Sequence, residues 1–426
     1  MNVELINTGS ELMLGRVLNT HQQWLCRRLA DLGCVVTRQV AVADKADDIE
    51  HAVRDALARA DVVITTGGLG PTSDDLTRDL IARMLGKPLR EDPAIVAHIE
   101  HFFTTRKRAM PERTRVQALV PEGAIVLPNP NGTAPGLAME ITSNPQPLSP
   151  AGPFRARWLI MLPGPPRELR PMFADAVVPL LRRGLPPETE FVCRTLRTSG
   201  VGESIVQEKI GERLRRLVES GLDLGYCARV GEVDVRLAAR GVNAPELVRE
   251  AEAIVRQQLG AHIFGEENDE LETVVVRLLT ERKQTLALAE SCTGGLIAHR
   301  VTNVPGASAV FLAGLVTYGN AAKQTLLGVR AETVAGHGAV SEPVAREMAE
   351  GARRQTGADY ALSVTGIAGP TGGTPAKPVG TVFLGLATRH ETFVERNSNP
   401  YDRETFKQAT ANQALELLRR AVLRSA

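Results

Sequence analysis

The chain has 426 residues, of which 43% are hydrophobic, and these values predict two or three domains with ordinary buried cores. Its 50 lysine and arginine residues nearly balance its 49 aspartate and glutamate residues, which argues against a nucleic-acid-binding protein. The five cysteines are odd in number and lack CxxC spacing, which argues against a disulfide framework or a zinc site. The sequence shows no signal-peptide pattern and no apolar run of membrane length, so we expect a soluble cytoplasmic protein that contacts no membrane.

The first part of the chain alternates strand-like and helix-like segments. Strands are predicted at residues 3–8, 34–42 and 61–66, and helices at residues 20–32, 46–60 and 77–85. This alternation predicts a parallel, doubly wound α/β sheet, in which ligands bind beyond the carboxyl ends of the strands. The glycine-bearing segments 8–11 and 67–77 both fall at that edge.

The segment at residues 67–77 joins glycines to paired carboxylates. The amides of such a turn can cradle a phosphate, and carboxylates from several strand ends can hold a divalent metal. The predicted nucleotide-binding residues are Gly67, Gly68, Gly70 and Thr72, and the predicted metal ligands are Asp74, Asp75, Glu168 and Glu11. An equally weighted alternative makes Asp74 and Asp75 caps of the helix that follows.

The remainder of the first domain contains several loops between strands. Residues 129–136 are predicted as a tight loop, residues 142–153 as an exposed excursion, and residues 158–162 as a buried strand before a helix that opens with proline. His98 and His101 on a predicted helix over 94–104 are interpreted as a solvated face, because no third ligand is near. We expect this domain to cover residues 1–180.

Residues 188–264 have the pattern of a small α+β domain. Strands are predicted at residues 191–198 and 232–239, the second of them half-buried, and helices at residues 202–219 and 245–259. No catalytic constellation occurs in it. Residues 265–270 are predicted as a hinge before a third domain at residues 271–426, and flexible hinges near 185 and 266 would let the domains move.

The third domain contains the stretch with the clearest chemical content. An apolar, strand-like run ends at Glu290, and Ser291, Cys292, a threonine and two glycines precede a helix that starts near Leu296. A serine at such a turn meets converging N–H groups and the positive end of the helix dipole, which favours an alkoxide nucleophile. The alternatives are that Ser291 only caps the helix or that Cys292 is the nucleophile, although a thiol there is more often a buried apolar group.

The absence of histidine from the loops near Ser291 narrows the residue types that could act as its base. No histidine falls in these loop motifs, so a Ser–His–Asp triad has little support, and a lysine kept neutral by burial or nearby positive charge is the remaining way to activate Ser291. Lys323 and Lys377 are the candidates, and Tyr318 could relay the proton, although a lone lysine is usually solvated. The glycine-dense loop at residues 366–373 could bind an oxyanion or a phosphate, or only turn the chain.

Several motifs, in order, resemble those of the CinA (competence/damage-inducible protein A) family. In the third domain they are residues 289–295 (AESCTGG), 316–323 (VTYGNAAK), 337–341 (HGAVS), 363–373 (SVTGIAGPTGG) and 377–381 (KPVGT). The first domain resembles the MoaB/MogA-like molybdopterin-binding fold through residues 65–77 (TTGGLGPTSDDLT), 131–136 (NGTAPG) and 162–168 (LPGPPRE), and the middle domain resembles a KH-type fold. One departure is Gly319, where serine or threonine is expected.

The resemblance implies a Ser/Lys nicotinamide-nucleotide amidohydrolase in the third domain. It implies that nicotinamide mononucleotide and water give nicotinic acid mononucleotide and ammonia without a cofactor, with Ser291 as nucleophile, Lys323 as base and Tyr318 as an assisting group. The predicted substrate-binding residues are Thr293, Gly294, Gly366, Gly369, Gly372, Gly373, Gly380 and Arg403. Arg403 is the candidate for the phosphate or the carboxylate of the product.

The resemblance further implies an ADP-ribose pyrophosphatase in the first domain, with a divalent metal (Mg or Co) and K⁺, and a homodimer. Our first hypothesis joins both activities in one enzyme whose partners are small nucleotides. A second makes the first domain the main catalyst and the third a nucleotide-binding regulator. A third makes the protein a non-enzymatic scaffold in competence or recombination, against which the near-zero net charge speaks.

Overall fold

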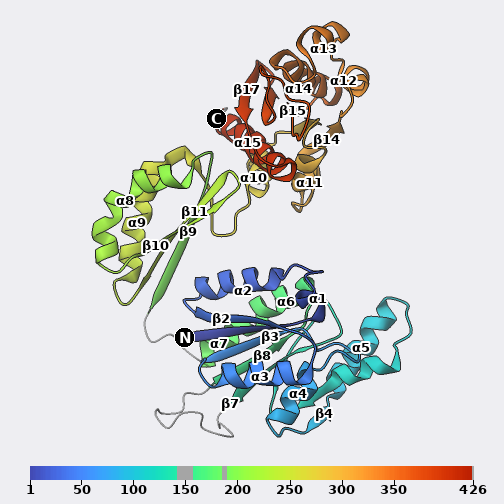
Figure 1. The fold of residues 1–426 in the computed structure, drawn as a ribbon, viewed down its shortest axis with the longest axis vertical. Coiled ribbons are helices and arrows are strands. Elements are labelled where there is room, and N and C mark those ends of the chain that lie inside the picture. Colours follow the sequence, from blue (N-terminus) through green and yellow to red (C-terminus); the bar gives the residue numbers. More distant parts are fainter. Residues whose placement is uncertain (142–156, 185–189, 425–426) are drawn as a thin grey trace. The chain divides into compact units, whose positions relative to one another are not determined.

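The computed structural model describes residues 1–141, 157–184 and 190–424. Contacts divide the chain into two compact units, Met1–Phe191 and Val192–Ala426 (Figure 1). The excursion predicted at residues 142–153 and the hinge predicted near residue 185 lie outside the described residues. In the described ranges, no helix is both long and apolar enough to span a bilayer.

A six-stranded sheet forms the centre of the first unit (Figure 1). Its order is β2 (Val35–Val42), β1 (Asn2–Thr8), β3 (Val62–Thr66), β8 (Arg157–Leu162), β7 (Gly136–Ile141) and β6 (Ile125–Leu127). The first four strands are parallel, and the last two run antiparallel. The predicted α/β class is confirmed, but the sheet is mixed, because the tight loop at residues 129–136 joins β6 and β7 as a hairpin.

Helices cover both faces of this sheet, which is why its central strands are apolar on both sides. On one face, α2 (Thr20–Asp31) and α6 (Pro166–Met172) share a core with Val62 and Ile64 of β3. On the other, α3 (Ala46–Leu57) and α4 (Thr77–Met84) share a core with Val63. The remaining helices and strands are α1 (Ser10–Met13), β4 (Leu89–Glu91), α5 (Pro93–Thr105), β5 (Leu119–Pro121) and α7 (Val178–Gly184).

The second unit begins with a small antiparallel module. Its sheet order is β10 (Asp223–Arg229), β11 (Glu232–Arg240), β9 (Phe191–Ser199) and β12 (Ile263–Glu266), and α8 (Glu203–Glu219) and α9 (Ala244–Leu259) pack together over the sheet. β11 is buried on both faces, not half-buried as predicted. The reason is that Arg197, itself buried, covers the face away from the helices through ion pairs with Glu232 and Asp234.

Hydrogen bonds and an ion pair hold the connection between the middle module and the C-terminal module. Arg197 donates to the carbonyl oxygen of Asp269 at 2.6 Å and pairs with Glu270 at 3.3 Å. From the last helix, Asn412 donates to the carbonyl oxygen of Val230 at 2.6 Å. The middle and C-terminal modules thus form one compact unit held by these contacts, and the hinge near residue 266 stays a prediction.

The C-terminal module is built on a five-stranded sheet. Its order is β14 (Phe311–Val316), β13 (Leu286–Glu290), β15 (Tyr360–Gly366), β16 (Thr381–Ala387) and β17 (Thr392–Ser398), with the first three parallel and the rest antiparallel. The helices are α10 (Leu271–Arg282), α11 (Leu296–Thr302), α12 (Asn320–Leu327), α13 (Ala331–His337), α14 (Glu342–Thr356) and α15 (Arg403–Arg424). The parallel register brings the carboxyl ends of β13, β14 and β15 to one edge.

Candidate functional site

Ser291 and Lys323 meet at that edge of the C-terminal sheet. Ser291 directly follows β13, and Lys323 lies on α12, which follows the neighbouring strand β14. Lys323 Nζ is 3.1 Å from Ser291 Oγ, and the two side chains are buried, with only 1% of Lys323 exposed. Two of the predicted catalytic groups are thus within hydrogen-bonding distance.

Two backbone carbonyls hold the amine of Lys323. Nζ donates to the carbonyl oxygens of Thr317 at 2.8 Å and Tyr318 at 3.2 Å. Desolvation by burial lowers the pKa of Lys323, which favours the neutral amine. In its neutral form the amine has two N–H donors and one lone pair, so donation to the two carbonyls would leave the lone pair for the proton of Ser291 Oγ. This arrangement suits a general base.

The two alternatives for the turn at residues 291–295, hereafter the serine turn, do not hold. Cys292 belongs to the hydrophobic core, and burial raises the pKa of its thiol to about 12, so a nucleophilic thiolate does not form near neutral pH. The N-cap of α11 is Gly295, not Ser291, so the serine hydroxyl does not cap that helix.

A buried carboxylate, that of Glu290, organises the serine turn. It accepts hydrogen bonds from the amides of Gly295 at 2.9 Å, Ile297 at 3.2 Å and Ala298 at 2.8 Å. These N–H groups are therefore not available to an oxyanion, which corrects our expectation that the start of this helix would stabilise the alkoxide. Sequence reasoning assigned Glu290 no role, although an acidic residue shortly before a helix is a capping signal.

Two other amides of the turn, those of Cys292 and Thr293, interact with the thiol of Cys292. Within the described part of the chain, the N–H groups of Cys292 and Thr293 donate to no oxygen. Thr293 is completely buried, and its hydroxyl has no hydrogen-bond partner among the described residues. The predicted site residue Thr293 therefore lies beside Ser291 with unused hydrogen-bonding capacity.

Arg403, at the start of α15, connects Tyr318 to the glycine-dense loop. Its guanidinium donates to the carbonyl oxygen of Gly369 at 2.9 Å and bonds the hydroxyl of Tyr318. Tyr318 thus turns its hydroxyl to Arg403 and is 59% exposed, while its carbonyl oxygen holds Lys323. The assisting role of Tyr318 in proton transfer stays a prediction.

The other predicted site residues of this module lie around the edge. Lys377 donates to the carbonyl oxygen of His337 at 2.7 Å, which leaves Lys323 as the lysine on Ser291. A Cβ on Gly366 would lie 2.9 Å from the carbonyl oxygen of Thr381, and one on Gly380 would lie 2.8 Å from the backbone of Asn399, so packing explains both glycines. Gly372 and Gly373 fall in an exposed segment, and their substrate contacts stay predictions.

The first unit has a second glycine-rich turn, residues 67–72, hereafter the glycine turn. Gly67 and Gly68 have φ of +98° and +68°. A Cβ on Gly67 would lie 2.7 Å from the carbonyl oxygen of Thr8, and one on Gly68 would lie 2.0 Å from Thr77 Oγ1. Only glycine fits at these two positions, because the turn packs tightly against the end of β1 and the start of α4. Gly70 and Thr72 lie beside the carboxylate of Asp75.

The predicted metal ligands of the first unit are not gathered. Asp75 accepts from the amide of Thr72 at 2.9 Å and from its hydroxyl, and buried Glu168 accepts from Asn129 at 2.8 Å. Among the described residues, no group of three or more His, Cys, Asp or Glu side chains could hold a metal ion. Glu11, Asp74, Asp75 and Glu168 therefore do not fit a common metal site made of protein ligands.

Two expectations about this unit are corrected. The N-cap of α4 is Leu76, without a side-chain hydrogen bond, so Asp74 and Asp75 do not cap that helix. His98 is half-buried rather than solvated, because its Nε2 lies 3.0 Å from the carbonyl oxygen of Gly132.

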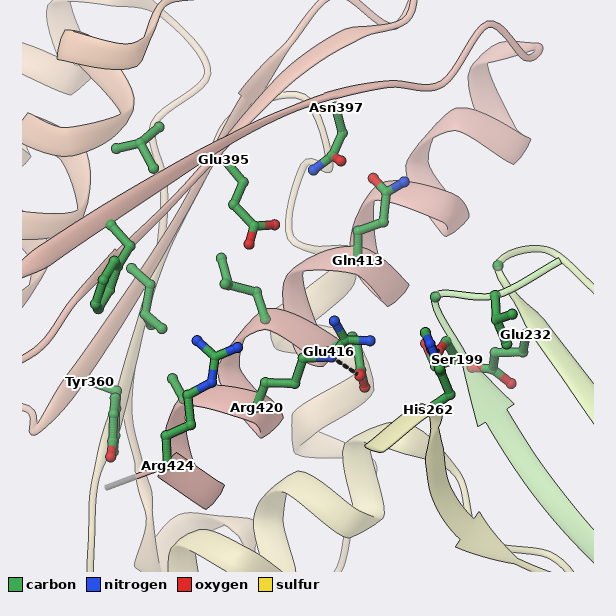
Figure 2. Close-up of a pocket in the computed structure, with 18 of the residues that line it drawn as sticks. Ser199, Glu232, His262, Tyr360, Glu395, Asn397, Gln413, Glu416, Arg420 and Arg424 are labelled. Atoms are coloured by element: carbon green, nitrogen blue, oxygen red, sulfur yellow. Dashed lines mark hydrogen bonds and ion pairs between the residues drawn. The ribbon is translucent and has the colours of Figure 1, made fainter. Parts of the chain in front are cut away.

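A cavity of about 1240 Å³ lies between the middle and C-terminal modules of the second unit (Figure 2). Ser199 and His262 line it from the middle module, and Arg420 and Arg424 line it from α15. Figure 2 shows that Arg420 is engaged by Glu416. Neither the serine turn nor α12 lines this cavity, so it is separate from the site around Ser291.

Comparison with known proteins covers the whole chain. Three family models match in succession: "Probable molybdopterin binding domain" at residues 4–183, "Damage-inducible protein CinA KH domain" at 193–265 and "CinA C-terminal domain" at 268–422. A "Putative competence-damage inducible protein" of Symbiobacterium thermophilum is 45% identical over 99% of each chain. The chain belongs to the CinA family. A CinA-like protein of Akkermansia muciniphila is also 45% identical, over 97% of this chain and 96% of its own.

Solved CinA structures match only part of the chain. The competence/damage inducible protein CihA from Agrobacterium tumefaciens is 40% identical, covers 36% of this chain and 97% of its own, and has a TM-score of 0.35. The predicted resemblance to CinA and the predicted fold class, with MoaB/MogA-like, KH-like and CinA C-terminal domains, are confirmed by the family models. The family and its domain composition indicate an enzyme with a CinA-type function.

Proposed function

We propose that the second unit hydrolyses the carboxamide of nicotinamide mononucleotide to give nicotinic acid mononucleotide and ammonia. The observation that carries the proposal is the 3.1 Å contact between Ser291 Oγ and the buried amine of Lys323. Membership of the CinA family, in which the sequence motifs imply this reaction, supports it.

The first half of the reaction forms an ester. Ser291 Oγ attacks the carboxamide carbon while its proton moves to Lys323 Nζ. We assign the oxyanion to the amides of Cys292 and Thr293, which donate to no carbonyl oxygen among the described residues. The tetrahedral intermediate collapses as the C–N bond breaks and Lys323 gives the proton to the leaving nitrogen. Ammonia departs, and the acyl group stays on Ser291.

The second half of the reaction regenerates the serine. Water attacks the ester carbon, Lys323 accepts a proton from that water, and the C–O bond to Ser291 breaks as Lys323 returns the proton to Oγ. Nicotinic acid mononucleotide leaves as its carboxylate, with one proton released to solvent. The reaction as written requires water and no cofactor.

Ammonia and the acid product should be measured with purified full-length protein. We expect Ser291→Ala and Lys323→Ala each to lose at least about 10³-fold in kcat, since nucleophile and base act as a unit. Matched controls are Ser308→Ala, an exposed serine of the same module, and Lys209→Ala, an exposed lysine of the middle module, which should keep full activity. Undiminished activity of Ser291→Ala would overturn the assignment.

A second candidate function concerns the first unit, for which we propose phosphate-ester binding at the glycine turn and cleavage of ADP-ribose. The tight turn after β3 at the carboxyl edge of the sheet favours it. Among the described residues, the carboxylates of this unit do not form a common metal site. ADP-ribose cleavage should be assayed with and without Mg²⁺, Co²⁺ and K⁺, with Asp75→Ala as the test variant and Ser291→Ala as the control.

The two assays separate the enzyme hypotheses. Cleavage of ADP-ribose with no release of ammonia would favour the alternative in which the first unit is the catalyst and the second a nucleotide-binding regulator. Salt-sensitive binding to DNA, with neither activity, would favour the competence or recombination scaffold. We propose a cytoplasmic homodimer that binds small nucleotides rather than nucleic acid or membranes, and light scattering of the purified protein tests the assembly state.

A further inference from the structure

Two basic residues stand one helical turn apart at the start of α15. Arg403 and Lys407 have i, i+4 spacing, which places them on one face of the helix. Arg403 contacts only a carbonyl oxygen and a phenol hydroxyl in the described part of the chain. Lys407 has no hydrogen-bond or ion-pair partner among the described residues, although its side chain is half-buried.

The serine turn lies against Lys407. A Cβ built on Gly294 would lie 3.9 Å from Lys407 Nζ, and Gly294 is three residues from Ser291. Arg403, one helical turn before Lys407, bonds the carbonyl oxygen of Gly369 and the hydroxyl of Tyr318, the residue whose carbonyl oxygen holds Lys323. Lys407 thus lies beside the serine turn, and Arg403 lies beside Tyr318 and the glycine-dense loop.

The nearby carboxylates do not neutralise these cations. Asp402 accepts from the amides of Glu404 at 3.0 Å and Thr405 at 3.1 Å, so it caps the start of α15. Glu290 is buried and bonded to three amides of its own turn. A half-buried cation without a partner carries a desolvation cost that an anionic ligand would offset.

We propose that Lys407, together with Arg403, binds the phosphate of the substrate and makes the second unit selective for phosphorylated nucleotides over nucleosides. The planar guanidinium can contact two phosphate oxygens, and the ammonium supplies a compact second charge. In a nucleotide the ribose separates the phosphate from the carboxamide, and Lys407 lies beside Gly294, three residues along the turn from Ser291. The selectivity rests on the proposed amidohydrolase reaction, whereas the phosphate binding does not.

Steady-state kinetics of Lys407→Met test the selectivity. With nicotinamide mononucleotide we expect KM to rise about 10-fold to 100-fold and kcat to change less than about 3-fold, because the lost contact is made equally in the ground and transition states. With nicotinamide riboside, which lacks the phosphate, kcat/KM should stay within about 2-fold of the parent value. Lys407→Arg keeps the charge and should retain most of the affinity. An unchanged KM for the nucleotide in Lys407→Met would overturn the proposal.

Calorimetric titration separates this proposal from the proposed reaction. Ribose 5-phosphate should bind the full-length protein and lose at least about 10-fold in affinity in Lys407→Met, whereas nicotinic acid should bind equally to both proteins. Lys407-dependent binding of ribose 5-phosphate by a protein that releases no ammonia would refute the reaction and keep the phosphate site. Lys407-dependent binding of nicotinic acid but not of ribose 5-phosphate would assign these cations to the carboxylate product and overturn the phosphate site.

Discussion

The serine turn and the glycine turn begin from the same local architecture. Each follows a fully buried parallel strand, β13 or β3, and each has two successive glycines with positive φ, at 294 and 295 or at 67 and 68. They differ in the residue that the neighbouring strand brings into contact with the turn. β14 brings the chain to Lys323, which reaches the hydroxyl of the serine turn, whereas β1 ends in Thr8, which packs against Gly67.

The two turns also use their carboxylates differently. Glu290 is 1% exposed and bonds three amides, so it fixes the shape of the serine turn, in which Ser291 contacts Lys323. Asp75 is only half-buried and bonds the amide and hydroxyl of Thr72 within its own turn. A glycine-rich turn at a strand end therefore gains chemistry from groups on adjacent elements, and the glycines alone do not supply it.

The largest effect should come from keeping the charge of Lys323 while removing its basicity. Lys323→Arg places a guanidinium that stays protonated at all accessible pH values beside Ser291. We expect kcat for ammonia release to fall at least about 10³-fold, while ADP-ribose cleavage by the first unit is unchanged. Parallel assays of both reactions check this, and substantial amidase activity in the variant would show that Lys323 acts as a cation rather than as a base.

The dependence of the reaction on pH should report the same amine. Only neutral Lys323 accepts a proton, so kcat/KM should rise about 10-fold per pH unit and level off above the pKa of Lys323. Burial lowers that pKa, so the plateau should begin below the value of about 10.4 typical of lysine. The stability contributed by the neutral amine has the same sign: it is present at high pH and lost as pH falls through the lowered pKa. A pH profile that reaches no plateau below pH 10.4 would contradict the assignment.

The carboxylates of the two turns offer a matched pair of conservative substitutions. Glu290→Gln places an amide NH₂ near three backbone N–H groups, so the free energy of unfolding of the second unit should fall by about 1.5–3 kcal/mol. Asp75→Asn in the less buried turn should cost the first unit about 1 kcal/mol or less. Urea denaturation of both full-length variants measures the difference. Equal costs would mean that Glu290 does not organise its turn as the geometry indicates.

The smallest effect is expected at the thiol beside the nucleophile. Cys292 packs in the hydrophobic core with its thiol protonated, so Cys292→Ala should leave kcat within about 2-fold of the parent. The lost core contact should lower the free energy of unfolding by about 1 kcal/mol. Ammonia release and urea denaturation measure the two effects, and a large loss of activity in a well-folded variant would reopen the thiol as the nucleophile.

The sequence predicted most strands and helices because their apolar periods are clear, and it missed those with weak periods. β10 (DLGYCAR) contains a glycine and few apolar residues, and β17 (TFVERNS) is a short, largely exposed strand at the sheet edge. The antiparallel end of the first sheet was missed for another reason. Strand direction depends on which strands pair, and a single sequence does not encode that pairing locally.

For the site, side chains were easier to predict than backbone groups. Ser291 and Lys323 were predicted as a pair because their residue types carry the chemistry, and the structure brings them to 3.1 Å. The carbonyl oxygens of Thr317 and Tyr318, which hold the amine, cannot be read from residue type, since every residue has one. Lys407 was also missed, although its i, i+4 spacing from Arg403 at the start of a helix was a usable signal. The four carboxylates of the first unit were predicted to share a metal because they lie at the same sheet edge. In the structure Asp75 and Glu168 instead accept hydrogen bonds from Thr72 and Asn129, and the sequence alone does not reveal these bonds.

The helix α15 has 22 residues and is therefore about 33 Å long. Near its start Lys407 lies beside Gly294 of the serine turn, and further along Asn412 and Arg419 bond the carbonyl oxygens of Val230 and Ala261 in the middle module. One helix thus carries the two cations that we propose to bind the phosphate and the groups that bond the middle module. A ligand that shifts this helix should therefore change the stability of the contact between α15 and the middle module. By thermodynamic linkage, weakening that contact should change the affinity for the ligand by the same factor.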